Sequence, residues 1–320
     1  MEYKNVKGHI YDIQGYAVHD GPGIRTTVYT KGCPLICLWC HSPESQRHEF
    51  ELGYLQIKCL GTGVCENACV NACPVGALSK NEPVEALNGS GLIQKVSIDR
   101  EKCTGCLKCA EACITKALYP TGWDTTVDEV YERVIKDRGF FKNGGGITIS
   151  GGEAMAQFEF TLNLAKRLKD SGVHICLDTT GFAPAERYEE ILPFIDLFLY
   201  DIKHMNTETH KKLTGVPNEL ILENARFLAQ HGAALQIRVP VIPKLSDSEV
   251  NLRATAEFCA SLPRDSVKLV QLLPYHKTGR MKYERLGRKY KITNVEPPND
   301  EFMQKTLELF KSYGLNAQLH

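Results

Sequence analysis

The sequence Cys33-Pro-Leu-Ile-Cys37-Leu-Trp-Cys40 places three cysteines within eight residues, with the spacing C-x3-C-x2-C. Three thiolates on one tight loop can bind three irons of a four-iron cubane cluster and leave the fourth iron without a protein ligand. An open metal position lets a substrate coordinate directly, so the spacing favours a reactive cluster. The alternatives are a zinc site that lacks one ligand and a chance grouping of cysteines. His41 could complete a zinc site, but it directly follows Cys40 and would be cramped there.

The other cysteines extend this pattern. Eleven of the thirteen lie in three groups between residues 33 and 113. The spacing x2-x2-x3 of the last group matches the bacterial ferredoxin run, in which the fourth cysteine binds the neighbouring cluster. The middle group has wider gaps, x5-x3-x3, which makes its ligands harder to assign. A crossover between the two groups gives one cubane bound by Cys103, Cys106, Cys109 and Cys73, and another bound by Cys59, Cys65, Cys69 and Cys113.

Two structural zinc sites are the alternative for these eight cysteines. Four-cysteine zinc sites usually combine two short C-x2-C hooks, whereas residues 103–113 form one continuous run, so two cubanes are favoured. The remaining cysteines, Cys176 and Cys259, lie in apolar stretches and are expected to be buried structural residues.

Two parts of the chain differ in cysteine content and in the pattern of their apolar residues. Residues 58–119 hold eight cysteines and little continuous apolar sequence, so this stretch needs metal to hold it together. From about residue 120, short apolar runs at 147–150, 174–179, 195–201, 235–240 and 268–273 alternate with amphipathic stretches such as 158–169, 223–230 and 249–261. This alternation predicts a parallel sheet, open or barrel-like, with its chemistry at the carboxyl ends of the strands. We therefore expect one domain from residues 1–57 and 120–320 and an inserted domain from residues 58–119.

Composition excludes several classes of protein. The 320 residues carry 38 Lys plus Arg and 38 Asp plus Glu, and this zero balance argues against nucleic-acid and membrane-surface binding. No apolar run reaches the roughly 18 residues of a membrane span. The first residues lack the apolar stretch of a signal peptide, so we expect a cytoplasmic protein. Cysteines in the reducing cytoplasm rarely form disulfides, so clustered ones there indicate metal ligands or redox groups.

Further motifs accompany the cysteines. They are His19-Asp-Gly-Pro-Gly-Ile-Arg-Thr-Thr, Gly151-Gly-Glu, Asp201-Ile-Lys-His-Met-Asn, Leu213-Thr-Gly-Val and Leu272-Leu-Pro-Tyr-His276. Together they resemble the radical S-adenosylmethionine (SAM) superfamily and, within it, the activating enzymes of glycyl-radical enzymes, over nearly the whole chain. The insertion resembles the longer subtype of these enzymes. The resemblance implies an α/β fold, a partial (β/α)6 TIM-type barrel with an inserted ferredoxin-like [4Fe–4S] domain.

The resemblance also implies an activity. The enzyme would cleave SAM reductively to methionine and a 5′-deoxyadenosyl radical, which removes hydrogen from a glycine backbone of a partner glycyl-radical enzyme under anaerobic conditions. Three [4Fe–4S] clusters are implied, one that coordinates SAM and two in the insertion, with flavodoxin or ferredoxin as electron donor and a monomeric chain. Whether the insertion relays electrons or serves docking stays open at this point.

Three other functions are alternatives to this activity. A radical SAM enzyme that acts on a small molecule differs in lacking a pocket open to a protein loop. A pure electron carrier leaves the three-cysteine site and some 200 further residues without a purpose. A zinc-bound nucleic-acid module conflicts with the zero net charge.

Residues at the predicted strand ends are the SAM-site candidates. The resemblance assigns Gly151, Gly152 and Glu153 to the methionine amino group, although Ala154 stands where the family usually has proline. It implies a monovalent-cation site at Asp178, Thr179 and Asp201. Taken alone, the acids could instead be solvated surface residues, and Arg238, inside an apolar run, needs an anionic partner. The residues expected beside the adenine are Trp39, His41 and His276, and the other candidates are Ile202 and Lys203.

Overall fold

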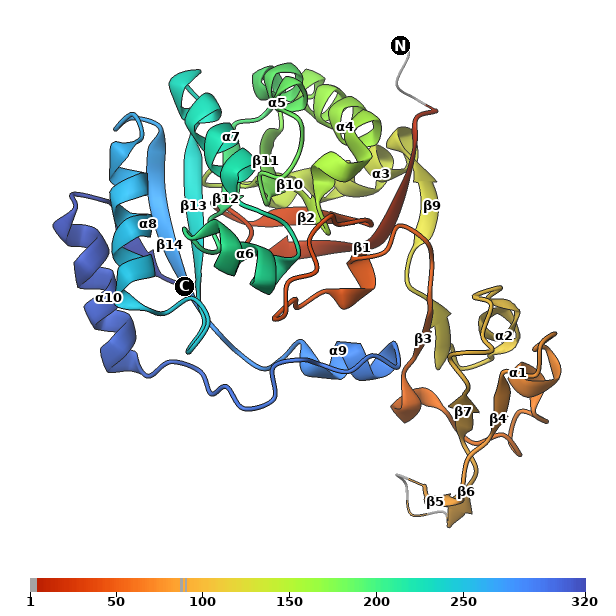
Figure 1. The fold of residues 1–320 in the computed structure, drawn as a ribbon. Coiled ribbons are helices and arrows are strands. Elements are labelled where there is room, and N and C mark those ends of the chain that lie inside the picture. Colours follow the sequence, from red (N-terminus) through yellow and green to blue (C-terminus); the bar gives the residue numbers. More distant parts are fainter. Residues whose placement is uncertain (1–4, 87–88, 90) are drawn as a thin grey trace. The chain divides into compact units, whose positions relative to one another are not determined.

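The computed structural model describes residues 5–86, 89 and 91–320 (Figure 1). The chain forms two compact units. The first contains Met1–His48, Asp124–Gly279 and Lys291–His320, and the second contains Glu49–Trp123 and Arg280–Tyr290. The expected insertion, residues 58–119, falls inside the second unit, which also includes its flanks and a segment from far downstream.

A nine-stranded sheet forms the centre of the first unit. Its spatial order is β15-β14-β13-β12-β11-β10-β2-β1-β9. All pairs from β2 through β15 are parallel, and β1 runs antiparallel to β2. The strands are β1 (Lys7–Ala17), β2 (Arg25–Thr30), β9 (Trp123–Thr126), β10 (Gly146–Gly151), β11 (His174–Thr179), β12 (Leu197–Asp201), β13 (Leu235–Val241), β14 (Val267–Pro274) and β15 (Ala317–Leu319). The predicted α/β class and parallel sheet are confirmed.

Helices follow the parallel strands, as the alternating pattern predicted. They are α3 (Val127–Val134), α4 (Phe158–Asp170), α5 (Ala185–Ile191), α6 (Thr207–Thr214), α7 (Glu219–Gln230), α8 (Glu249–Ser261) and α10 (Asp300–Ser312). Short 3-10 turns lie at Pro43–Ser45, Gln56–Lys58, Ile135–Phe140, Ala154–Gln157 and Leu192–Phe194. None of the helices within the described residues is long and apolar enough to cross a membrane.

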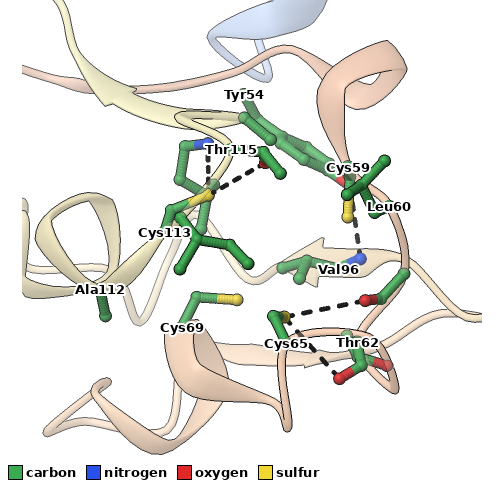
Figure 2. Close-up of a pocket in the computed structure, with 14 residues that line it drawn as sticks. Tyr54, Cys59, Leu60, Thr62, Cys65, Cys69, Val96, Ala112, Cys113 and Thr115 are labelled. Atoms are coloured by element: carbon green, nitrogen blue, oxygen red, sulfur yellow. Dashed lines mark hydrogen bonds between the residues drawn. The ribbon is translucent and has the colours of Figure 1, made fainter.

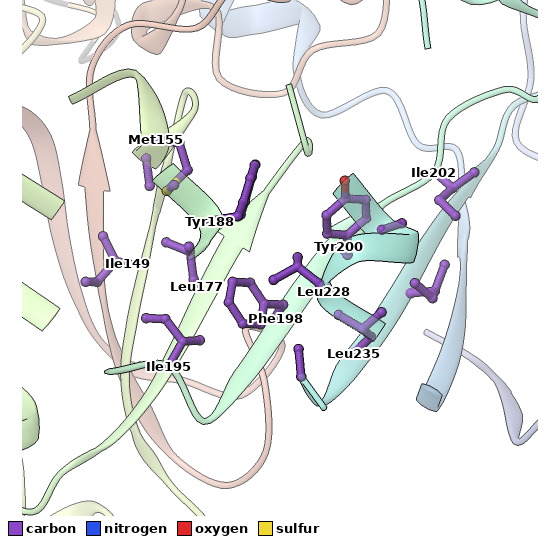
Figure 3. Packing of buried hydrophobic residues seen from close by; sticks show 14 of the residues in the cluster. Ile149, Met155, Leu177, Tyr188, Ile195, Phe198, Tyr200, Ile202, Leu228 and Leu235 are labelled. Carbon is purple, nitrogen blue, oxygen red and sulfur yellow. The ribbon is translucent and has the colours of Figure 1, made fainter. Parts of the chain in front are cut away.

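The apolar core lies on one face of this sheet. Alternate residues of β13, Leu235, Ile237 and Val239, are buried in it, whereas Gln236 and Arg238 between them point to the other face. Figure 3 shows the packing of strand and helix residues in the core, including Ile149, Leu177, Phe198, Tyr188 and Leu228. The face opposite the core is therefore where polar strand residues gather.

The second unit has little regular structure. Three two-stranded ladders pair β3 (Leu52–Tyr54) with β8 (Leu118–Pro120), β4 (Leu78–Lys80) with β7 (Val96–Ile98), and β5 (Val84–Glu85) with β6 (Leu92–Ile93). Its helices are α1 (Ala68–Asn71), α2 (Lys108–Ala112) and α9 (Arg280–Arg285). Its buried cluster is small and includes the thiols of Cys69 and Cys109. A core of this size needs a further source of stability, as the sequence indicated.

Candidate functional site

The cysteine loop (residues 33–40) is held by backbone hydrogen bonds on both sides. On one side, the Cys33 N–H group donates to the Gln46 carbonyl at 3.0 Å. On the other side, the N–H groups of Ile36 and Leu38 donate to the carbonyls of the last two residues of α6, at 2.8 and 3.0 Å. The loop conformation therefore depends on an element about 180 residues away in the sequence.

Gly151 and Gly152 let the end of β10 pack directly against the entry to the cysteine loop. A β-carbon on Gly151 would lie 2.2 Å from the backbone of Thr30, and one on Gly152 would lie 2.4 Å from the carbonyl oxygen of Gly32. The Gly152 and Glu153 N–H groups donate to the Thr30 and Gly32 carbonyls, each at 2.9 Å. The Gly-Gly-Glu sequence thus positions the loop as well as lining the site.

The cysteine loop faces a hollow at the carboxyl ends of the strands. One cavity, of about 740 Å³ with its open mouth included, is lined by Cys33, Cys37, Cys40, Trp39, His41, Gly151, Gly152, Asp178, Thr179, Asp201 and Lys203, among others. An adjoining cavity of about 980 Å³ shares five of these residues and adds Arg238 and His276. Thirteen of the fifteen residues expected around SAM therefore line one hollow.

Two ion pairs lie inside this hollow. Arg238 Nη1 lies 3.0 Å from Asp178 Oδ1, so the anionic partner expected for this arginine is present. Lys203 Nζ donates to Asp201 Oδ2. Burial raises the pKa of Asp178, and the positive charge of Arg238 offsets part of this rise. The Arg238 Nε atom is buried, and among the residues that the structure describes it has no hydrogen-bond partner. The hollow thus contains both signs of charge, as a ligand with an amino-acid zwitterion requires.

Aromatic rings form one end of the hollow. The rings of His41 and His276 lie 4.2 Å apart at a tilt of 35°. The Nε2 atom of His41 is 3.2 Å from the His276 carbonyl oxygen, and the Thr278 hydroxyl is 2.6 Å from His276 Nδ1. Trp39 is buried beside them in the lining. These flat rings suit the apolar face of a nucleobase.

In the second unit, Cys59, Cys65, Cys69 and Cys113 line a common apolar cavity of about 410 Å³, its open part included (Figure 2). Burial, together with the neighbouring thiols, raises the pKa of Cys69 to about 11. The Leu118 N–H group donates to Cys113 Sγ at 3.5 Å. These four cysteines are the ones that the crossover between the two runs predicted.

Among the other four cysteines, Cys73, Cys103 and Cys109 lie near one another. Burial raises the pKa of Cys109 to about 11, with contributions from the Cys103 and Cys73 thiols nearby. The Ala77 N–H group donates to Cys73 Sγ at 3.2 Å, which parallels the bond to the last cysteine of the first group. Cys106 is exposed. N–H groups that donate to cysteine sulfur, as those of Ala77 and Leu118 do, stabilise the sulfur ligands of a cluster and tune its reduction potential.

The two cysteine runs of the second unit share features of backbone conformation. Asn67 and Leu107, the residues before α1 and α2, both have left-handed backbone, with φ of 60° and 62°. Gly76 and Lys116, each three residues after the last cysteine of its run, also have positive φ. The two halves of the second unit therefore share one local conformation around their cysteines.

The donor set fits iron–sulfur clusters. Burial raises the pKa of Cys37 to about 12. Since the thiolate is the metal-binding form, metal binding must release protons from such buried thiols. Across the described positions, no three His, Cys, Asp or Glu side chains form a site for a single metal ion. Grouped sulfur donors of this kind are those that iron–sulfur clusters use.

Comparison with known proteins identifies the family. A model of the radical SAM superfamily matches residues 102–255, and a model of the 4Fe-4S dicluster domain matches residues 58–117. An indoleacetate decarboxylase activating enzyme from Tractidigestivibacter scatoligenes is 36% identical over 98% of this chain and 97% of its own. A trans-4-hydroxy-L-proline dehydratase activating enzyme from Clostridioides difficile is 37% identical over 97% and 98%. An isethionate sulfite-lyase activating enzyme from Nitratidesulfovibrio vulgaris is 42% identical over 91% and 92%.

The chain belongs to the glycyl-radical-enzyme activating enzymes of the radical SAM superfamily. The family resemblance drawn from the motifs is confirmed. This activating enzyme uses SAM and iron–sulfur clusters, and its protein substrate is a glycyl-radical enzyme.

Two expected SAM-site residues of the activating enzyme do not line the hollow. Ile202 is buried in the apolar core, and its N–H group donates to the Arg238 carbonyl at 2.9 Å. The Glu153 carboxylate accepts bonds from the Thr179 hydroxyl at 2.8 Å and from the Thr180 N–H and hydroxyl groups at 2.7 and 2.5 Å. The structure thus places Glu153 behind the strand ends rather than along the cavity.

Sequence reasoning missed two contributors to the site of the activating enzyme. Thr180 lines the cavity and binds Glu153, and its position directly after Asp178-Thr179 was the available signal. The end of α6 holds the cysteine loop through backbone carbonyls. Its Leu-Thr-Gly-Val motif was noticed, but carbonyl acceptors leave no pattern of side chains from which their partners can be deduced.

Proposed function

We propose that the hollow at the strand ends binds SAM and that Cys33, Cys37 and Cys40 hold the cluster with the open iron. The observation that carries the proposal is that three loop thiols share one cavity with Asp178, Asp201, Lys203 and the glycine pair. When bound, the cluster supplies the electron that cleaves SAM to methionine and a 5′-deoxyadenosyl radical, which takes hydrogen from a glycine of the partner.

The residues of the chain bind and orient SAM. Arg238 and Lys203 supply donors for its carboxylate, and Asp178 and Asp201 supply acceptors for its ammonium group. The rings of Trp39, His41 and His276 supply the face for adenine. Asp178, Thr179 and Asp201 also offer oxygen atoms to a monovalent cation. Support comes from the shared lining of the two cavities and from the ion pairs already present there.

The architecture around this site is proposed to be a partial (β/α)6 barrel. The six strands β2 and β10–β14 are adjacent in chain order and parallel, which is the order of strands in a TIM-type barrel. The strand β15 adds to the end of this series.

The second unit is proposed to hold two cubanes with crossed ligands. One is bound by Cys59, Cys65, Cys69 and Cys113, and the other by Cys73, Cys103, Cys106 and Cys109. The shared cavity of the first set and the mutual influence of Cys73, Cys103 and Cys109 support this assignment. We further propose a monomer in the reducing cytoplasm, with flavodoxin or ferredoxin as donor; grouped cysteines that bind metal rather than form disulfides are typical of reducing compartments.

The partner enzyme is identified by experiment. The three relatives differ in the partner that their names state, at similar identities, so a glycyl-radical enzyme encoded beside this gene is the first candidate. The anaerobically reconstituted protein, SAM, dithionite and that candidate are mixed and followed by EPR. We expect an organic radical on the candidate and formation of methionine.

The control is the variant with Cys33→Ala, Cys37→Ala and Cys40→Ala, which should form neither product. Methionine formation that depends on a small molecule, with no radical on any glycyl-radical candidate, would contradict the proposal. It would favour a radical SAM enzyme with a small-molecule substrate.

A further inference from the structure

A basic segment from late in the sequence belongs to the second unit. Residues Arg280–Tyr290, which contain α9, read Arg-Met-Lys-Tyr-Glu-Arg-Leu-Gly-Arg-Lys-Tyr and carry five basic residues and one acid (Figure 1). We call this stretch the basic segment. With it, the second unit contains twelve Lys and Arg against nine Asp and Glu, within a chain of zero net charge. The segment therefore gives this unit its positive charge.

The basic segment is anchored by its apolar residues. Tyr283, Leu286 and Tyr290 are buried, and the two tyrosine rings contact each other edge to face at 5.0 Å. Arg288 binds both carboxylate oxygens of Glu51, at 2.7 and 2.6 Å. Arg280 and Lys289 are exposed, and Arg280 Nε lies 3.6 Å from Oε1 of Glu284, the one acid of the segment.

The basic segment lies next to the cysteine group that contains Cys106. Arg100 donates to the Arg285 carbonyl at 3.1 Å, and a β-carbon on Gly287 would lie 2.7 Å from Arg100 Nε. Arg100 lies three residues before Cys103, whose N–H group donates to the carbonyl of the adjacent residue Asp99 at 3.1 Å. Arg100 therefore connects the basic segment to the start of this cysteine run.

Exposure distinguishes this group from the other one. Cys106 is exposed, whereas Cys59, Cys65, Cys69 and Cys113 are buried or half-buried. Electron transfer slows steeply with distance, so an external donor reaches a cluster fastest where its ligands approach the surface. Cys106 belongs to the cysteine run that begins three residues after Arg100, the residue that contacts the basic segment, so the exposed part of this run and the positive charge of the segment together suit a charge-steered encounter.

We propose that the basic segment Arg280–Tyr290 is the docking surface for an acidic one-electron donor protein, which delivers its electron at the Cys106 edge of the second unit. The donor loses one electron and the chain gains one, with no atom or proton transferred. The inference rests on the proposed cluster content of the second unit. A small, charge-dominated contact is typical of transient redox partners, whose complexes must separate after each transfer.

The test uses the complete reconstituted protein with Arg280→Glu and Lys289→Glu combined. An acidic flavodoxin in its hydroquinone form is mixed with it in a stopped-flow instrument, and the bleaching of the cluster absorbance is followed at several salt concentrations. We expect reduction of the wild type to slow with salt, and the variant to be slower by about tenfold at low salt with a flatter salt dependence. Iron content and reduction by dithionite should equal those of the wild type.

The matched control is Arg264→Glu combined with Lys268→Glu, two exposed residues at the start of β14 in the first unit. It makes the same change in net charge and should keep the wild-type rate. Equal slowing of both variants, or normal reduction of the basic-segment variant by flavodoxin, would overturn the proposal. Normal reduction of the basic-segment variant, combined with loss of the radical on the partner enzyme, would also overturn the proposal. It would show that the segment binds the glycyl-radical enzyme instead of the donor. Failure of the wild type to cleave SAM with dithionite would contradict the proposed function instead.

Discussion

The carboxylate of Glu153 is buried among donors that belong to the strand ends of the SAM site. It accepts from the Met155 N–H group at 3.0 Å, the Thr179 hydroxyl and two groups of Thr180. Burial raises its pKa, while these donors lower it. Its N–H group also binds the entry of the cysteine loop. The side chain thus joins the end of β10 to the end of β11, which explains why a glutamate follows the glycine pair, and the backbone N–H group of the same residue binds the loop.

At this scale we predict that Glu153→Ala destabilises the first unit by about 3 kcal/mol, because four donors lose a buried acceptor. The melting temperature, measured anaerobically by circular dichroism, should fall clearly. The exposed neighbour Glu159, as Glu159→Ala, is the control and should change stability by less than about 0.5 kcal/mol. A variant with wild-type stability that binds SAM poorly would show that Glu153 contacts the ligand.

Among the elements, α6 determines the conformation of the cysteine loop. The helix begins at the cap residue Asn206, whose side chain accepts from the Thr209 N–H group, and it ends at Gly215, which has a φ of 91°. The left-handed conformation of Gly215 ends the helix. The last two carbonyls of the helix accept hydrogen bonds from N–H groups of the cysteine loop. A β-carbon on Gly215 would lie 2.7 Å from Ile36 Cγ1. Glycine is therefore required at position 215 for two reasons: it ends the helix, and it leaves room for the cysteine loop.

We predict that Gly215→Ala loses about 1 kcal/mol of stability and also displaces the cysteine loop. Gly232→Ala is the matched control, since Gly232 also follows a helix with a φ of 79° but has no neighbour within 4 Å of a new β-carbon. Both variants should melt at similar temperatures, but only Gly215→Ala should bind SAM more weakly by isothermal titration and alter the EPR signal of the reduced cluster. Identical SAM affinity in the two variants would contradict this role.

For the whole molecule, the two units place their thiols independently. The three cysteines of the loop lie in the first unit, whereas the other eight ligand candidates lie in the second. Each unit has its own buried cluster, a large one beside the nine-stranded sheet and a small one that includes thiols. Loss of one metal site should therefore leave the other sites able to form.

We predict about twelve irons and twelve sulfides per chain after anaerobic reconstitution, from three four-iron clusters. The variant with Cys33, Cys37 and Cys40 all changed to alanine should keep about eight irons and lose SAM cleavage. Iron and sulfide analyses measure this result. Zinc in the anaerobically purified native protein, or a loss of all iron from the variant, would contradict it.

The spacing of residues along the chain was sufficient to predict much of this protein. Three cysteines in one loop and the x2-x2-x3 run are local patterns, so they favoured iron–sulfur clusters; together with the other motifs they carried the family resemblance, which the comparisons confirm. The strand–helix alternation predicted the parallel sheet in the same way, because period and length are local properties.

The tertiary structure alone decided which groups meet. Arg238 pairs with Asp178 because β13 and β11 end at the same edge of the sheet, on either side of β12. Glu153 lies behind the cavity, α6 holds the cysteine loop through carbonyls, and the basic segment returns to the second unit. These contacts join residues far apart in the chain through backbone groups and buried donors. The spacing of residues along the sequence does not reveal which backbone groups will pair, since nearly every residue has the same N–H and carbonyl groups.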